Sequence, residues 1–174
     1  AVLVDAPCSG LGVMADKPDV KYRVTPESVA EIVDTQRRLL DAVCGYVKPG
    51  GTLLLNCPWT GEALERHLPA AAKRAIAEKG IRFYTIDAVK IAERLGLGSH
   101  TNTVLQSAFF RLMPVIPVEE TIGYMKAAAQ KTYFAKGEDV VNKNLAAIDA
   151  GGEGLVKVEI PGAWKDAQDA AAPK

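Results

Sequence analysis

The sequence has little of what marks several common protein classes. Its three cysteines, Cys8, Cys44 and Cys57, form no C-x-x-C pair. This count argues against a disulfide framework, a zinc site or an iron–sulfur cluster held by this chain alone, and it fits a reducing cytoplasm. No apolar run approaches the roughly 20 residues that a membrane helix needs, and no signal peptide opens the chain. We therefore expect a cytoplasmic protein with no resident metal and no membrane partner.

The sequence also lacks a net charge. The chain has 21 basic residues (lysine plus arginine) and 21 acidic residues (aspartate plus glutamate). It therefore has no net positive charge that would attract polyanions, and RNA is not an expected partner. The 174 residues are 48% hydrophobic, which is enough to bury the core of one domain. Ala1 begins directly in a strand-like run without an initiator methionine. We therefore expect the chain to be a fragment.

The hydrophobic pattern predicts alternating strands and helices. Buried strands are expected over residues 1–4, 52–55 and 82–86, and a half-exposed strand over residues 156–160. Helices are expected over residues 26–47 with Thr25 as N-cap and Pro26 at the first position, 63–79 with a break at Pro69, 88–95 with Asp87 as cap, 102–113, 119–131 and 138–150. This order predicts an α/β fold: an incomplete Rossmann-like parallel sheet flanked by helices, with a helical C-terminal half and one further edge strand.

The first 50 residues carry a family signature. Residues 5–12 read Asp-Ala-Pro-Cys-Ser-Gly-Leu-Gly, and together with residues 17–23 and 36–42 they resemble an S-adenosylmethionine-dependent RNA 5-methylcytosine methyltransferase. Such enzymes need an attacking thiolate after the next strand. When the family pattern is aligned on Gly50-Gly51, that position is Pro58, and Cys57 stands one place early. The glycine-rich turn for the methyl donor is also missing, so the sequence favours Cys8 as a strand-end residue of a scaffold.

A second and longer signature follows residue 50. It is carried by residues 50–59, 83–92, 96–110, 131–133, 136–137, 141–144 and 161–164. Residues 56–59 read Asn-Cys-Pro-Trp, and residues 96–102 read Gly-Leu-Gly-Ser-His-Thr-Asn. The segment 51–174 resembles the gamma-type domain of pyruvate:ferredoxin (flavodoxin) oxidoreductase.

This second resemblance implies a parent enzyme that decarboxylates a 2-oxoacid, with coenzyme A as substrate. Its thiamine diphosphate, magnesium and iron–sulfur clusters would lie in other domains or subunits, which would be the partners of this chain, and ferredoxin or flavodoxin would receive the electrons. The gamma-type domain would cover the active-site region and help to receive coenzyme A. The chain alone is expected to hold no cofactor and to be inactive.

Three asparagines are the candidate cofactor-binding residues. Asn102 follows a glycine-containing turn and is expected either to cap a helix or to present its positive end to a phosphate. Asn142 and Asn144 lie in a predicted helix, where asparagine is a poor former, so exposure to a partner, a cofactor or solvent is expected. No catalytic residue and no metal ligand is assigned, and Ser99-His100 has no triad partners.

The sequence therefore predicts a methyltransferase-like strand and helix at residues 1–50, a gamma-type domain at 51–166 and a linker at 167–174. Three hypotheses remain open for its function. They are a coenzyme A-facing fragment of the oxidoreductase, a fragment of the RNA methyltransferase, and a non-functional chimera of the two.

Overall fold

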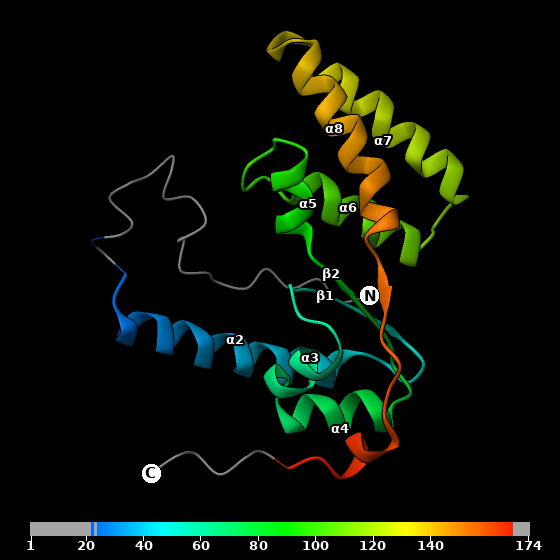
Figure 1. The fold of residues 1–174 in the computed structure, drawn as a ribbon. Helices are drawn as coiled ribbons and strands as arrows, with labels where there is room; N and C mark the ends of the chain where they lie inside the picture. The colour runs from blue at the N-terminus through cyan, green and yellow to red at the C-terminus, as the bar shows by residue number, and fades with distance from the viewer. Residues whose placement is uncertain (1–21, 23, 169–174) are drawn as a thin grey trace. The chain divides into compact units, whose positions relative to one another are not determined.

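A computed structural model describes residue 22 and residues 24–168 of the chain. The strand predicted at residues 1–4 lies outside the described residues. The elements, in chain order, are α2 (Pro26–Tyr46), β1 (Thr52–Asn56), α3 (Gly61–His67), α4 (Ala70–Glu78), β2 (Arg82–Ile86), α5 (Ala88–Arg94), α6 (Asn102–Leu112), α7 (Val118–Tyr133), η2 (Phe134–Lys136), α8 (Glu138–Glu153), β3 (Val156–Lys157) and η3 (Gly162–Asp166) (Figure 1). The predicted α/β fold with a helical C-terminal half is confirmed. No helix among the described residues is long and apolar enough to cross a lipid bilayer.

The described residues divide into two compact units. Within the described ranges, the first unit draws on residues up to 53, 62–83 and from 159 onward, and the second draws on residues 54–61 and 84–158. The strands β1 and β2 each begin in the first unit and end in the second. Each unit has its own core.

The sheet has the strand order β1-β2-β3. The amide of Arg82 donates to the carbonyl of Gly51, and the amide of Cys57 donates to that of Ile86, so β1 and β2 run in the same direction. β3 is antiparallel to β2 and is shorter than the predicted strand over residues 156–160. The chain leaves the sheet after Lys157 and reaches Pro161, which is the N-cap of η3.

In the first unit, α2 is fixed at both ends. Thr25 caps its start and Pro26 lies in the first turn, as the sequence predicts, and Ser28 completes a reciprocal capping box with Thr25. At its end, the amine of Lys79 donates to the carbonyls of Cys44, Gly45 and Val47 at 2.8, 2.7 and 3.1 Å. These carbonyls belong to the last turn of the helix and its cap, so the lysine satisfies acceptors that the helix itself leaves open.

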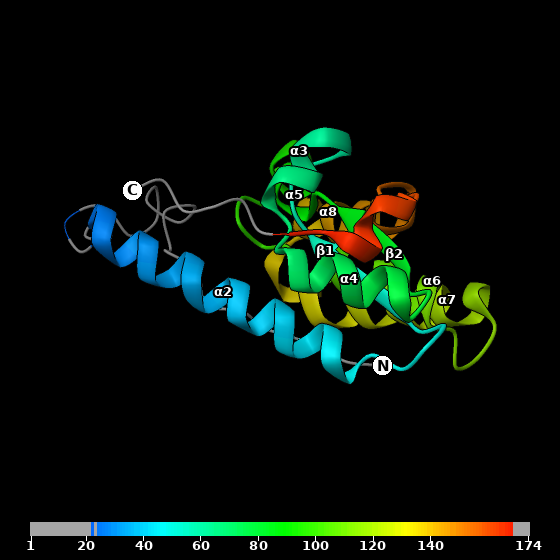
Figure 2. The same cartoon turned by 90° about the horizontal axis from the view of Figure 1, so that it is seen from below.

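The core of the first unit brings α4 against η3, and Figure 2 shows the two side by side. Trp164 of η3 is 3% exposed, and its ring centroid lies 6.4 Å from that of Phe83 on β2. Its indole Nε1 donates to the Glu65 carboxylate at 2.7 Å. One aromatic side chain thus ties the end of the described chain to α3 and β2.

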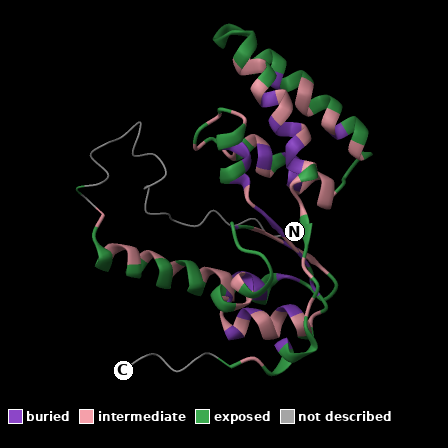
Figure 3. Ribbon diagram, viewed as in Figure 1, coloured by how far each residue is buried: buried purple, intermediate pink, exposed green. Residues whose placement is uncertain are grey.

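In the second unit, α5, α6 and α8 share a buried core, which Figure 3 shows where these helices meet. Its buried members are Ile86, Ala88, Ile91, Val104, Ala108, Ala147 and Ala150. Four of the seven are alanines, so the helix backbones approach closely. At Gly151 of α8 the approach leaves no room for a side chain, because a Cβ there would overlap the Val104 carbonyl oxygen and lie 2.9 Å from Ser107 Cβ.

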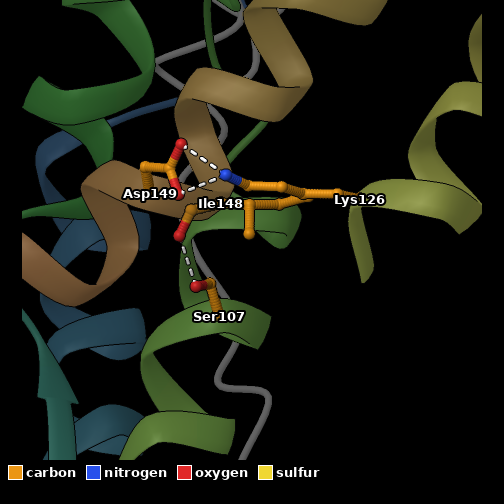
Figure 4. Close-up of polar contacts among 4 residues, drawn as sticks. All are labelled: Ser107, Lys126, Ile148 and Asp149. Atoms are coloured by element: carbon orange, nitrogen blue, oxygen red, sulfur yellow. Dashed lines mark hydrogen bonds and ion pairs between the residues drawn. The ribbon is translucent and has the colours of Figure 1, made fainter. Parts of the chain in front are cut away.

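Polar contacts hold α6 and α7 to α8. The hydroxyl of Ser107 on α6 donates to the carbonyl of Ile148, and the Lys126 amine on α7 pairs with both oxygens of Asp149 at 2.8 Å (Figure 4). Because the ion pair is half-exposed, it contributes little to the free energy of folding, and its main effect is to orient α7 against α8. Together with the small core residues, these contacts make the helical half a tightly packed support for the end of the sheet.

Candidate functional site

A cavity of about 200 Å³ lies in the second unit, at the carboxyl ends of β1 and β2. The residues that follow β1, the end of β2, the first turns of α5 and the segment after α8 all contribute to its wall. Open sheets with parallel strands bind their ligands at this end, because the strand-to-helix turns there leave a crevice. The cavity therefore occupies the position where this type of fold carries function.

The floor of the cavity is buried and mostly apolar. Ile86 and Ile91 are 1% and 9% exposed, and Val156 of β3 closes one side. Thr85 is 2% exposed and is the polar residue among these buried side chains of the floor. A small, mostly apolar pocket with a few polar groups is typical of a ligand site.

Charged groups on α5 form the rim. The Asp87 carboxylate accepts from the amide of Lys90 at 3.0 Å and so caps the helix, as the sequence predicts. The side-chain oxygen of Asn56 accepts from the amide of Ala88 at 3.0 Å, which joins the end of β1 to the same turn. Lys90 and Arg94, four residues apart, both line the cavity and are exposed.

Cys57 lines the cavity but is not an activated thiol. It is 7% exposed, its Sγ donates to the Trp59 carbonyl at 3.7 Å, and burial raises its pKa, with the charge of Asp87 acting in the same direction. In the first unit, burial and Asp41 raise the pKa of Cys44 to about 11. Both thiols stay protonated near neutral pH, which opposes a role as nucleophile.

We expect both thiols to resist chemical modification. In a Cys8→Ser variant, Cys44 and Cys57 should react with a disulfide reagent at pH 8 at least about 100-fold more slowly in the folded chain than in urea, because the thiolate is the reactive form. Stability should also fall as the pH rises from 9 towards 11, since the unfolded thiol of Cys44 loses its proton there and the folded one keeps it. Rapid labelling of either residue without urea would contradict this.

The structure separates the three predicted asparagines by environment. Asn102 and Asn142 are exposed, whereas Asn144 is 4% exposed, so its predicted exposure is wrong. Its amide oxygen accepts from the Thr103 hydroxyl at 3.0 Å, and its amide nitrogen donates to the Val140 carbonyl at 2.9 Å. Asn144 fixes α8 to the first turn of α6, which carries Asn102. None of the three lines the cavity.

The start of α6 also differs from the prediction. Asn102 is its first helical residue, and Thr101 is the N-cap, with no hydrogen bond from its side chain to the helix. The capping role predicted for Asn102 is therefore wrong. His100 points back to the turn, with Nδ1 2.9 Å from the Leu97 carbonyl oxygen. The first turn of α6 thus lacks a side-chain cap and presents Asn102 at the surface.

Lys90 and Arg94 were not singled out by the sequence analysis. The signal was present, because both follow the capping residue Asp87 on one face of a helix. It could be recognised only once the walls contributed by residues 57–60 and 154–156 were known. Trp59, which follows Pro58 after the end of β1, is 37% exposed and does not line the cavity. In the described ranges, no group of His, Cys, Asp or Glu could hold a metal ion.

Comparison with known proteins shows the family. Residues 13–154 match the family model described as "Pyruvate ferredoxin/flavodoxin oxidoreductase". The chain is 49% identical over 126 residues to the pyruvate:ferredoxin oxidoreductase of Moorella thermoacetica, covering 72% of this chain and 11% of that protein. It is 46% identical over 123 residues to the pyruvate-flavodoxin oxidoreductase of Enterobacter agglomerans, covering 71% of this chain and 10% of that protein.

More distant relatives have other electron acceptors in their names. The chain is 38% identical over 133 residues to the mitochondrial pyruvate dehydrogenase [NADP(+)] of Euglena gracilis, covering 75% of this chain and 7% of that protein. The chain thus spans about a tenth of the length of the curated relatives that it matches. The family match extends into residues 1–50, and the resemblance of that segment to a methyltransferase stays a prediction. The chain belongs to the pyruvate ferredoxin/flavodoxin oxidoreductase family.

Proposed function

We propose that this chain is the gamma-type domain of a cytoplasmic 2-oxoacid:ferredoxin or flavodoxin oxidoreductase, covering the active-site region and helping to receive coenzyme A. The observation that carries the proposal is the family match over residues 13–154, together with relatives named for pyruvate and for ferredoxin or flavodoxin. In this proposal residues 51–166 are the domain and residues 167–174 are a linker.

The chemistry of the parent enzyme would come from cofactors held elsewhere. In this proposal, thiamine diphosphate, magnesium and iron–sulfur clusters are held by other domains or subunits of the parent. Two facts support this division: the described residues contain no group of three His, Cys, Asp or Glu that could hold a metal ion, and Cys44 and Cys57 are both buried. The share of this chain is positioning: it would contact other domains of the parent, which pass electrons to ferredoxin or flavodoxin.

The surface that would receive coenzyme A is the start of α6. Asn102 stands in its first turn, where backbone amides and the positive end of the helix favour a phosphate, and no side chain caps this turn. The second candidate contact residue for coenzyme A is Asn142 on α8, which is exposed. The hydrogen bonds of Asn144 to both helices support this surface from beneath, which makes Asn144 a positioning residue rather than a contact.

A segment exchange tests the proposal. The part of the Moorella thermoacetica relative that aligns with this chain would be replaced by the corresponding residues of this chain, and pyruvate-dependent reduction of ferredoxin would be measured. We expect the exchanged enzyme to retain activity that depends on coenzyme A. In it, Asn102→Ala with Asn142→Ala should raise the KM for coenzyme A about 100-fold or more and leave the KM for pyruvate unchanged, because each lost hydrogen bond to a charged group costs about 1.5 kcal/mol or more.

Two outcomes bear against the proposal. A folded exchanged enzyme with its clusters intact but without pyruvate oxidation would contradict the functional assignment. Unchanged kinetics for coenzyme A in the double variant would contradict the assigned surface alone. Lys131→Ala, which replaces an exposed cation at the far end of α7, is the matched control.

The alternatives give different results in simpler assays. A methyltransferase fragment should bind S-adenosylmethionine in titration calorimetry, whereas the proposed domain should not, and Cys57 should form no covalent adduct with 5-azacytidine-substituted RNA. The burial and raised pKa of Cys57 support the second expectation. A chimera would be recognised by reading the source DNA across the codon of Gly50.

A further inference from the structure

We propose that the cavity at the carboxyl ends of β1 and β2 binds a small organic anion carrying a single negative charge. This site is distinct from the asparagine surface at the start of α6, and the proposal does not depend on the coenzyme A role. It rests on three properties of the cavity: the charge of its rim, the apolar character of its floor and its volume.

The rim carries a net positive charge. Lys90 and Arg94 form no ion pair with any residue of the described ranges, and Asp87 is the acidic residue of the lining. Two cations against one carboxylate leave one positive charge, which a monoanion neutralises. The Arg94 guanidinium presents a fork of N–H donors that fits a carboxylate, and the neighbouring Lys90 amine adds a compact charge.

The floor selects an organic ligand over an inorganic one. Ile86, Ile91 and Val156 offer apolar contacts that a bare phosphate would leave unfilled. Val156 is 46% exposed although it is apolar, and a bound aliphatic chain would cover it. Thr85 lines the same floor and is its buried polar residue.

The volume limits the size of the ligand. Cavities that enclose drug-sized molecules have about 300–1,000 Å³, and this one has about 200 Å³. A nucleotide cofactor would not fit inside. A carboxylic acid with a chain of a few carbons would place its apolar part on the isoleucines and its carboxylate between the two cations.

The test uses the full chain and three probes that separate charge from apolar contact. Butyrate has both a carboxylate and an aliphatic chain, butanol has only the chain, and inorganic phosphate has only the charge. We expect butyrate to shift the backbone amide resonances of residues 85–91 and 154–156 saturably at millimolar concentration, and to bind at least about tenfold more tightly than either of the other probes.

Two variants and one control decide the outcome. Lys90→Gln with Arg94→Gln should weaken butyrate binding about tenfold, and Val156→Trp should abolish it by filling the cavity. All three positions are exposed, so the fold should be retained. Lys131→Gln with Lys136→Gln, at exposed positions of α7 and η2, should have no effect. Equal binding of butyrate and phosphate, or butyrate binding that survives either cavity variant, would overturn the proposal.

Discussion

Replacing Gly151 by alanine should destabilise the chain by about 2 kcal/mol or more, although alanine is the better helix former by about 1 kcal/mol. The added methyl group would overlap the Val104 carbonyl oxygen on α6 and press on the Ser107 side chain. Neither neighbour can yield easily, because one is backbone and the other is held by its hydrogen bond to Ile148. Urea unfolding followed by circular dichroism at 222 nm measures the effect.

The matched control is Gly123→Ala in α7. Gly123 is exposed, and a Cβ there would meet no atom within 4 Å. The same substitution should therefore stabilise the chain by up to about 1 kcal/mol through helix propensity alone. If both variants shifted the unfolding midpoint in the same direction, the close approach of α6 to α8 would not be what requires glycine at position 151.

Trp164→Ala should cost about 3–5 kcal/mol in the free energy of unfolding, the range measured for large aromatic side chains removed from cores. Trp164 is 3% exposed, packs on Phe83 and donates a hydrogen bond to Glu65. Its removal leaves a cavity under η3 and a carboxylate without its donor. The change in near-ultraviolet circular dichroism and the urea midpoint report the loss.

Two further substitutions separate the parts of this effect. Trp164→Phe keeps a ring against Phe83 but removes the indole donor, so it should cost about 1–2 kcal/mol. Trp59→Ala removes the other tryptophan, which is 37% exposed, and should change stability far less. A loss at Trp59 equal to that at Trp164 would show that burial does not set the cost.

The elements were predictable where local chemistry decides them. Thr25-Pro26 gave the start of α2, Pro69 gave the break between α3 and α4, and Asp87 gave the cap of α5. Each of these residues acts through a backbone restriction or a hydrogen bond within three residues, so one sequence contains all the information needed.

Predictions that depend on distant residues were less successful. Val33 belongs to the apolar stripe of α2, yet it is 40% exposed, because burial requires a partner that the stripe itself does not specify. The low helix propensity of asparagine suggested that Asn144 lies at the surface. It is buried, and its hydrogen bonds to Thr103 and Val140 offset the free-energy cost of removing its amide group from water.

The cavity could not be predicted for the same reason. Its walls come from segments near residues 57, 86, 91 and 155, and only the fold brings these together. The strand–helix–strand order predicted parallel strands, and open parallel sheets bind ligands at the carboxyl ends of their strands, but the candidate residues chosen from the sequence lie on α6 and α8. Lys90 and Arg94 could be assigned to a cavity only once the fold showed that residues 57–60 and 154–156 form its other walls.

The pairing of β3 with β2 has a kinetic consequence. Tyr84 and Thr85 lie opposite Lys157 and Val156, so the whole of α5 to α8 intervenes between the two strands. Closing so long a loop lowers the conformational entropy of the chain before β3 makes any contact with β2. Because β3 has only two residues, its pairing with β2 offsets little of this entropy cost. The helices, which form from contacts near in sequence, should therefore assemble first during folding, and β3 should join a preformed helical half as one of the last steps.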